Sequence, residues 1–137
     1  MKHGFSVAIA GFGLLAAGLP LAAHHSTAAT FDISQVVTIK GVVTEVTWLN
    51  PHGTFSLNVK DADGNIVNWT VELPPPNALM RRGWKRDDLR QGDQVSVDLW
   101  RAKDGSRLGN ALTVIFPDGR TMDFPRSLGT DWQTTLK

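Results

Sequence analysis

Apolar and polar residues alternate along several short stretches between residues 36 and 124, which is the pattern of half-buried β-strands. The first stretch runs from Val36 to Trp48, and its apolar positions change face just after Gly41, as in a strand that bulges to serve a curved sheet. Four more alternating stretches follow, at residues 55–59, 67–73, 95–99 and 112–116. We therefore predict one β domain of five strands over residues 36–124.

Turn and breaker residues separate these strands. The segment from Asp61 to Asn65 contains Gly64 and predicts a hairpin connection. Three consecutive prolines at positions 74–76 end the third strand, because none of them can donate a ladder hydrogen bond. Asn77 is then the expected N-cap of a short helix over residues 78–82, which Gly83 ends.

Three strands, a small helix and two further strands follow one another in the order of an OB-fold barrel. A closed sheet of this kind also leaves no long free strand edge. We therefore predict a small all-β, five-stranded OB-like barrel with one short helix between strands 3 and 4. An open β-sandwich of similar strands is the alternative. Trp69 lies on the apolar side of its strand, which indicates a place in the core.

The first 23 residues have the order of a secretory signal peptide. Lys2 precedes an uncharged apolar run over residues 5–19, and Pro20, Leu21, Ala22 and Ala23 follow. A membrane-spanning helix needs about 20 apolar residues, and this run is shorter and rich in glycine. The pattern therefore favours a cleaved export signal over an anchor, and predicts a periplasmic or secreted protein with no membrane span after cleavage.

Two cleavage points fit this signal, one after Ala23 and one after Ala29. Only the first leaves His24 as the new N-terminal residue. Residues 24–35 form an N-terminal segment ahead of the barrel, and residues 125–137 form a C-terminal tail in which the strand pattern fades.

Composition excludes several kinds of chemistry. The chain has no cysteine, which rules out disulfides, thiolate metal sites and thiol nucleophiles. Its net charge is +1, and without Lys2 the charges balance to zero. A neutral domain lacks the general electrostatic attraction for nucleic acid or for an anionic membrane. The basic residues between 81 and 90 are interspersed with Asp87 and Asp88 and are interpreted as a solvated face.

Several local motifs resemble a family of small exported bacterial proteins of unknown function. They are His24-His25-Ser26, Asn50-Pro51-His52, Asn77-Ala78-Leu79 with Arg82-Gly83-Trp84, and Leu89 with Gly92-Asp93. The resemblance covers nearly the whole mature chain. It implies export and a compact β domain, and it implies no particular reaction.

Enzyme signatures are missing from the sequence. Outside the signal the glutamates are Glu45 and Glu72 alone, and no nucleophile elbow or phosphate loop occurs. Glu72 falls at the twelfth position counted from Asp61, as in a calcium loop, but the sixth position is Ile66 where such a loop needs glycine. We therefore name no catalytic residue, and we expect a binding protein with a hairpin at residues 61–65.

Tryptophans supply one candidate binding surface. Trp48, Trp84 and Trp100 are available to recognise a partner protein or a small ligand. Trp100 has the opposite parity to Leu99 and its other apolar strand neighbours, so we expect it to face outward unless a bulge intervenes. This alternative needs no metal.

Histidines supply the other candidate site. Cleavage after Ala23 would leave the α-amine and the Nδ1 atom of His24 as a bidentate chelate. His52, in the turn that follows Asn50, would complete a nitrogen set of the histidine-brace type, and His25 offers an alternative chelate. Amine and imidazole donors in a tetragonal arrangement favour Cu(II), with zinc as the second choice. The sequence thus leads to the hypothesis of one copper ion on His24, His25 and His52, against the alternative that these histidines belong to a polar linker and a turn.

Overall fold

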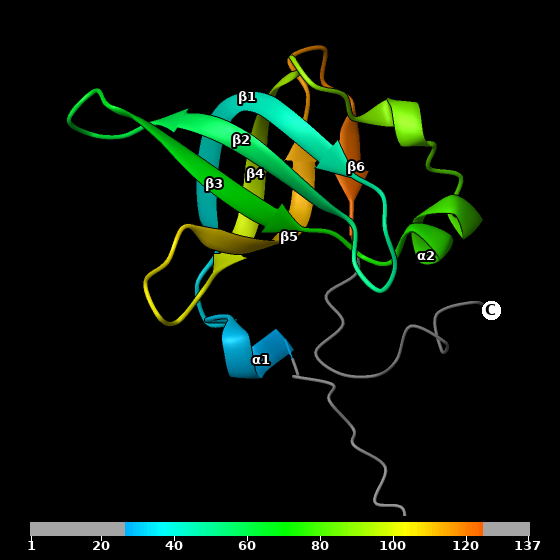
Figure 1. The fold of residues 1–137 in the computed structure, drawn as a ribbon, viewed down its shortest axis with the longest axis horizontal. Helices are drawn as coiled ribbons and strands as arrows, with labels where there is room; N and C mark the ends of the chain where they lie inside the picture. Colours follow the sequence, from blue (N-terminus) through cyan, green and yellow to red (C-terminus); the bar gives the residue numbers. More distant parts are fainter. Residues whose placement is uncertain (1–26, 125–137) are drawn as a thin grey trace, which may run out of the picture.

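The computed structural model describes residues 27–124, and the ribbon in Figure 1 shows one barrel with helical segments at its ends. Short helical elements lie before the first strand and between strands 3 and 4: α1 (Thr27–Thr30), α2 (Pro76–Arg81) and the 3-10 helix η1 (Arg86–Asp88). The strands are β1 (Val37–Thr47), β2 (Thr54–Lys60), β3 (Ile66–Glu72), β4 (Gln94–Arg101), β5 (Leu108–Ile115) and β6 (Thr121–Asp123).

The sheet closes on itself. Its strands follow the order β3-β2-β1-β4-β5-β6, and β3 also pairs with β5 in parallel, from Thr70 opposite Leu108 to Glu72 opposite Asn110. The first five strands therefore form a closed barrel with the helix between β3 and β4, as the sequence predicted. The alternative of an open sandwich is wrong, because a sandwich would leave β3 and β5 unpaired.

The long first strand serves both halves of the barrel. Its beginning pairs with β4 and its end pairs with β2, with a register shift between Val43 and Glu45. Gly41 lies where the two pairings overlap, and a Cβ atom there would collide with the main-chain carbonyl of Asn58 on β2. The predicted irregularity after Gly41 is confirmed, since a strand must bend sharply to pair with two neighbours around a small barrel.

A short sixth strand adds to the edge of β5. A turn closed by the Phe116 amide and the Arg120 carbonyl reverses the chain, and β6 then pairs with residues 113–115. Met122 and Phe124 are buried in the main core by this return. The count of five strands omitted β6 because only three of its residues pair.

The helix between β3 and β4 begins two residues earlier than Asn77 as N-cap implied. Pro75 is the N-cap, Pro76 is the first helical residue, and no side chain caps the helix. The prediction of Asn77 as N-cap is wrong, because proline at the first helical position has the required backbone angle and no amide to satisfy. Gly83 ends the helix with a φ of 91°, as expected, and Leu79 is fully buried in the core.

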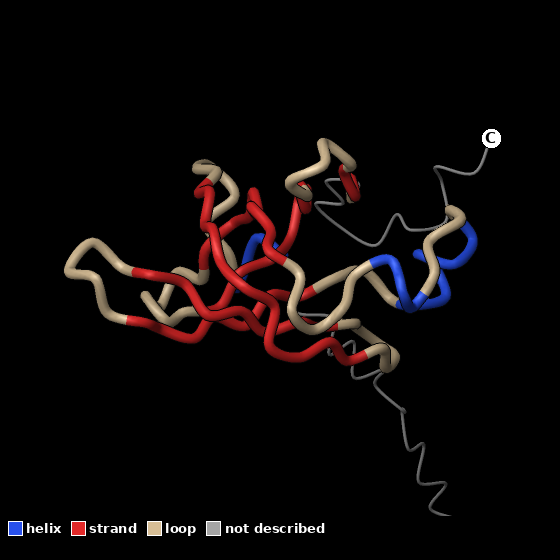
Figure 2. Tube along the Cα trace, turned by 90° about the horizontal axis from the view of Figure 1, so that it is seen from above, coloured by secondary structure: helices blue, strands red, loops and turns tan. Residues whose placement is uncertain are grey.

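The core fills the interior of the barrel. It contains Trp69, so its predicted place is confirmed, together with Phe55, Leu57, Val71, Val97, Leu99 and Val114. Seen from above in Figure 2, α2 and η1 project beyond the strands as a separate helical lobe. Among the residues described, no helix has the length and apolar character needed to span a membrane.

We predict that Gly41→Ala lowers the free energy of unfolding by about 1–3 kcal/mol, because the new methyl group must displace the backbone of β2. Urea denaturation monitored by circular dichroism measures the effect. Gly53→Ala is the matched control, since a Cβ at Gly53 approaches Leu73 only to 3.4 Å, and its midpoint is expected to stay close to that of the parent. Equal stabilities for the two variants would contradict the close approach at Gly41.

Candidate histidine site at the end of the barrel

His52 lies in the loop between β1 and β2, which is tied to the end of β3. The Leu73 amide donates a hydrogen bond of 2.8 Å to the Gly53 carbonyl, and the Gly53 amide contacts the Pro74 carbonyl at 3.4 Å. These backbone contacts extend the pairing of β2 and β3 past Thr54 and Glu72. They place His52 beside the last outward-facing residue of β3.

That residue, Glu72, is the partner of the histidine. The Nδ1 atom of His52 lies 3.7 Å from the Oε2 atom of Glu72, and the two side chains are 55% and 28% exposed. This contact is too long for a hydrogen bond, so the carboxylate lies beside the imidazole without fixing its tautomer. The arrangement therefore gives an accessible imidazole with one carboxylate as its neighbour.

Glu72 was not among the predicted site residues, although the predicted hairpin already placed it near His52. The hairpin predicted at residues 61–65 pairs positions symmetrically about the turn, which sets Thr54 opposite Glu72. His52 is only two residues before Thr54. The spacing of a calcium loop also singles out Glu72, but only the strand register predicts that it lies next to His52.

Other ligands for a metal are not gathered around this pair. Within residues 27–124, no three histidine, aspartate or glutamate side chains converge on one point. His24 and His25 lie outside the described residues. Of the three predicted copper ligands, the structure thus describes His52 alone and adds Glu72 as its neighbour.

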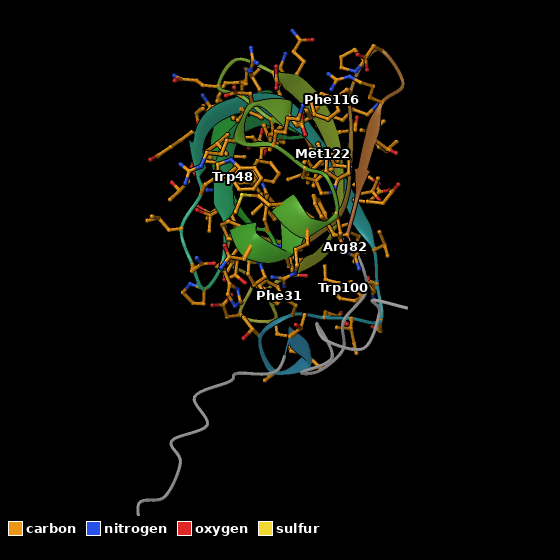
Figure 3. The ribbon with its side chains drawn as sticks, turned by 90° about the vertical axis from the view of Figure 1, so that its right-hand side faces the viewer. Phe31, Trp48, Arg82, Trp100, Phe116 and Met122 are labelled. Atoms are coloured by element: carbon orange, nitrogen blue, oxygen red, sulfur yellow. The ribbon has the colours of Figure 1, made fainter. Side chains whose placement is uncertain are left out.

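A row of outward-facing residues connects this pair to the N-terminal segment. Glu72 pairs with Asn110 on β5, and Asn110 pairs with Trp100 on β4. Neighbouring strands lie about 4.8 Å apart, so Trp100 is about 10 Å from Glu72 across the sheet. Phe31 packs against Trp100 on the same face, and Figure 3 shows both side chains at the end of the barrel near α1.

Trp100 is therefore not an exposed recognition residue. It faces away from the barrel interior, as its parity predicted, but only 3% of it is exposed. Phe31, Ala102 and Leu112 form a second apolar cluster around it, with Leu108 at the edge. The expected exposure is wrong because a segment from the start of the chain folds over this face.

Trp48 is also buried, at 9% exposure, and belongs to the main core. Its Nε1 atom has no hydrogen-bond partner among the described residues and no contact with solvent. Trp84 is half-buried and packs against the same core. The three tryptophans consequently do not form one exposed surface on the described barrel.

Backbone contacts fix the N-terminal segment in place. Phe31 forms an isolated bridge with Ala102, and the Asp32 amide donates to the Arg101 carbonyl at 2.9 Å. The Nζ atom of Lys103 donates to the Ala28 carbonyl at 2.6 Å. Residues 28–32 are thus held against the turn between β4 and β5.

The shifted carboxyl pKa values among residues 27–124 come from local hydrogen bonds. Hydrogen bonds from the Ser34 side chain and backbone lower the pKa of Asp32, and Ser106 does the same for Asp104. The pKa of Asp118 is lowered by hydrogen bonds and charge from Arg120. Asp104 and Asp118 are exposed and Asp32 is half-buried, and each accepts its hydrogen bonds from the residue two positions later, so the shifts reflect local turn formation.

The hairpin at residues 61–65 is confirmed. The Asp61 amide donates to the Asn65 carbonyl, and the Oδ1 atom of Asp61 accepts the amides of Asp63 and Asn65. The carboxylate that would begin a calcium loop therefore serves the turn itself.

Comparison with known families confirms the predicted membership of a family of unknown function. The model of a family of unknown function (DUF6152) matches residues 11–111. The chain belongs to this family. The match includes all of β1–β4 and the first four residues of β5, so it covers most of the barrel. No protein among those with curated descriptions matches the chain.

Phe31→Ala is predicted to destabilise the protein by about 3 kcal/mol, because it removes a buried ring and opens the second apolar cluster. Trp100 should then meet water, which red-shifts the tryptophan emission of the folded state. Chemical denaturation and emission spectra of the native protein measure the two effects. Phe31→Leu is the control and should keep most of the stability; an Ala variant with unchanged emission would show that Phe31 does not shield Trp100.

Proposed function

We propose that this protein is an exported, periplasmic or secreted barrel module that binds one Cu(II) ion at the end of the barrel. In this proposal His52 supplies its Nε2 atom, and His24 supplies its α-amine and imidazole after cleavage behind Ala23. The observation that carries the proposal is the accessible imidazole of His52, whose Nδ1 faces the Glu72 carboxylate at 3.7 Å.

The donor chemistry supports copper. Amine and imidazole nitrogens suit the tetragonal coordination of Cu(II), which also leads the affinity order of the divalent metals. Carboxylates next to a ligating imidazole commonly change metal affinity by about 10-fold to 100-fold, and Glu72 is the carboxylate beside His52. Zinc accepts the same donors with tetrahedral geometry, and a spectroscopic test separates the two metals.

The position of the N-terminal segment also supports it. His24 precedes Thr27 by three positions, which corresponds to at most about 10 Å of extended chain. The segment that follows docks over Trp100, on the outer face that also carries Glu72. His25 is one position nearer and offers the alternative chelate through its imidazole.

The competing proposal, a metal-free module that binds a partner protein or small ligand through tryptophans, loses its main support. Two of its three residues, Trp48 and Trp100, are buried. Trp84 alone would be a small recognition surface, since binding hot spots cluster in well-packed patches.

The test is a Cu(II) titration followed by EPR on protein that begins at His24. We expect a nitrogen-rich tetragonal signal that saturates at one equivalent. His24→Ala and His52→Ala should each weaken binding by at least about tenfold, and Glu72→Gln by about tenfold. Acetylation of the α-amine of His24 is the sharpest control, because it keeps every side chain and removes only the amine as a donor.

Several results would overturn the proposal. Equal copper affinity in a form that begins at Thr30 would exclude the N-terminal histidines as ligands. An unchanged EPR signal in His52→Ala would exclude the barrel residue, and preferential binding of zinc would exclude copper as the intended metal. N-terminal sequencing of the exported protein must show His24, since cleavage after Ala29 removes the chelate.

A further inference from the structure

Charge is distributed unevenly over the described residues. The basic lobe, which we define as residues 76–90 and which contains α2 and η1, has five basic and two acidic residues and a net charge of +3. The rest of the described chain has six basic and ten acidic residues and a net charge of −4. The near-neutral total therefore hides a strongly polarised molecule.

The two acidic residues of the lobe are engaged within it. The Oδ2 atom of Asp88 accepts the Lys85 amide at 2.7 Å, and Asp87 lies 3.9 Å from the Arg90 guanidinium. The other four basic side chains are exposed and have no ion-pair partner among residues 27–124: Arg81, Arg82, Lys85 and Arg86. A compact group of four uncompensated cations at one end of the molecule needs an anionic counterpart or remains a solvated patch.

Apolar side chains interrupt this group. Met80, next to Arg81, is 49% exposed. Trp84, next to Lys85, is half-buried. Figures 1 and 2 both show the lobe projecting beyond one end of the barrel. Basic residues beside Met and Trp on a protruding surface match the water–lipid interface, where indoles and long cationic side chains settle at the depth of the headgroups.

We propose that the basic lobe docks the protein peripherally on the surface of an anionic lipid bilayer. The cationic side chains meet lipid phosphates, and Met80 enters the interfacial layer. The net charge of −4 on the remaining described residues repels the same surface, which orients the barrel away from it. Because the lobe projects beyond the strands, it can touch a flat bilayer before the acidic remainder of the barrel does, which favours a bilayer as the partner. This docking requires no copper.

Sedimentation with vesicles tests the proposal. The protein begins at His24, because the apolar run at residues 5–19 would itself partition into lipid. We expect binding to vesicles of phosphatidylglycerol and phosphatidylcholine in equal amounts, weakening as salt rises, and little binding to phosphatidylcholine alone. Arg81→Gln with Arg82→Gln should weaken the partition about 25-fold, since one cationic residue near an anionic surface contributes about fivefold.

The matched control is Lys60→Gln with Arg107→Gln, which removes the same charge from exposed positions outside the lobe and should change the partition less than about threefold. Met80→Ser should weaken it about threefold to fivefold by removing apolar contact, whereas Ile66→Ser on β3, which removes a side chain of similar exposure, should not. Equal losses from the two charge variants would mean that general charge, not the lobe, causes binding. Binding to a soluble polyanion as tight as to vesicles, with Met80→Ser unaffected in both, would assign the lobe to acidic polymers and overturn the bilayer.

Discussion

Three parallel residue pairs between β3 and β5 hold the barrel closed, and the position of every surface feature follows from them. Without this pairing the strands would form an open sheet with two free edges. With it, Glu72 at the end of β3 lies one strand from Asn110 and two strands from Trp100. The loop that carries His52 and the cluster that receives Phe31 thereby share one end of the molecule, although they belong to different hairpins.

Much of the fold could be predicted from the sequence because local rules decide it. Alternation gives the five main strands, Gly41 marks the bend in β1, and Asp61 with Gly64 gives the hairpin between β2 and β3. The sequence could not show that Trp100 is covered, because its cover, Phe31, comes from a distant segment with only local helical structure. Only one residue of the site could be predicted from the sequence. His52 was a candidate because imidazole is a common metal ligand, whereas Glu72 lies beside it only because of the pairing register of β2 and β3.

The net charge of the chain does not reveal how charge is distributed over the surface. Summing over the chain suggests an electrically neutral domain, yet the fold segregates the charges, with cations in the helical lobe and an excess of carboxylates elsewhere. The turns use several of those carboxylates to accept backbone amides, as Asp61 and Asp93 do. Several acidic residues therefore stabilise turns by accepting hydrogen bonds, whereas most cations of the lobe have no ion-pair partner among the described residues.

The short helix α1 has a consequence for how the chain is processed. Ala29 and Thr30 both lie inside α1, and the backbone of Thr30 and the carbonyl of Ala28 are hydrogen-bonded to Lys103. A protease must draw its substrate into an extended shape, so the bond after Ala29 can be cut only while this segment is undocked. The bond after Ala23 precedes α1 in the chain. Under the proposed export, the order of folding and cleavage would select the N-terminus: a barrel that docks Phe31 before cleavage would keep His24 and His25.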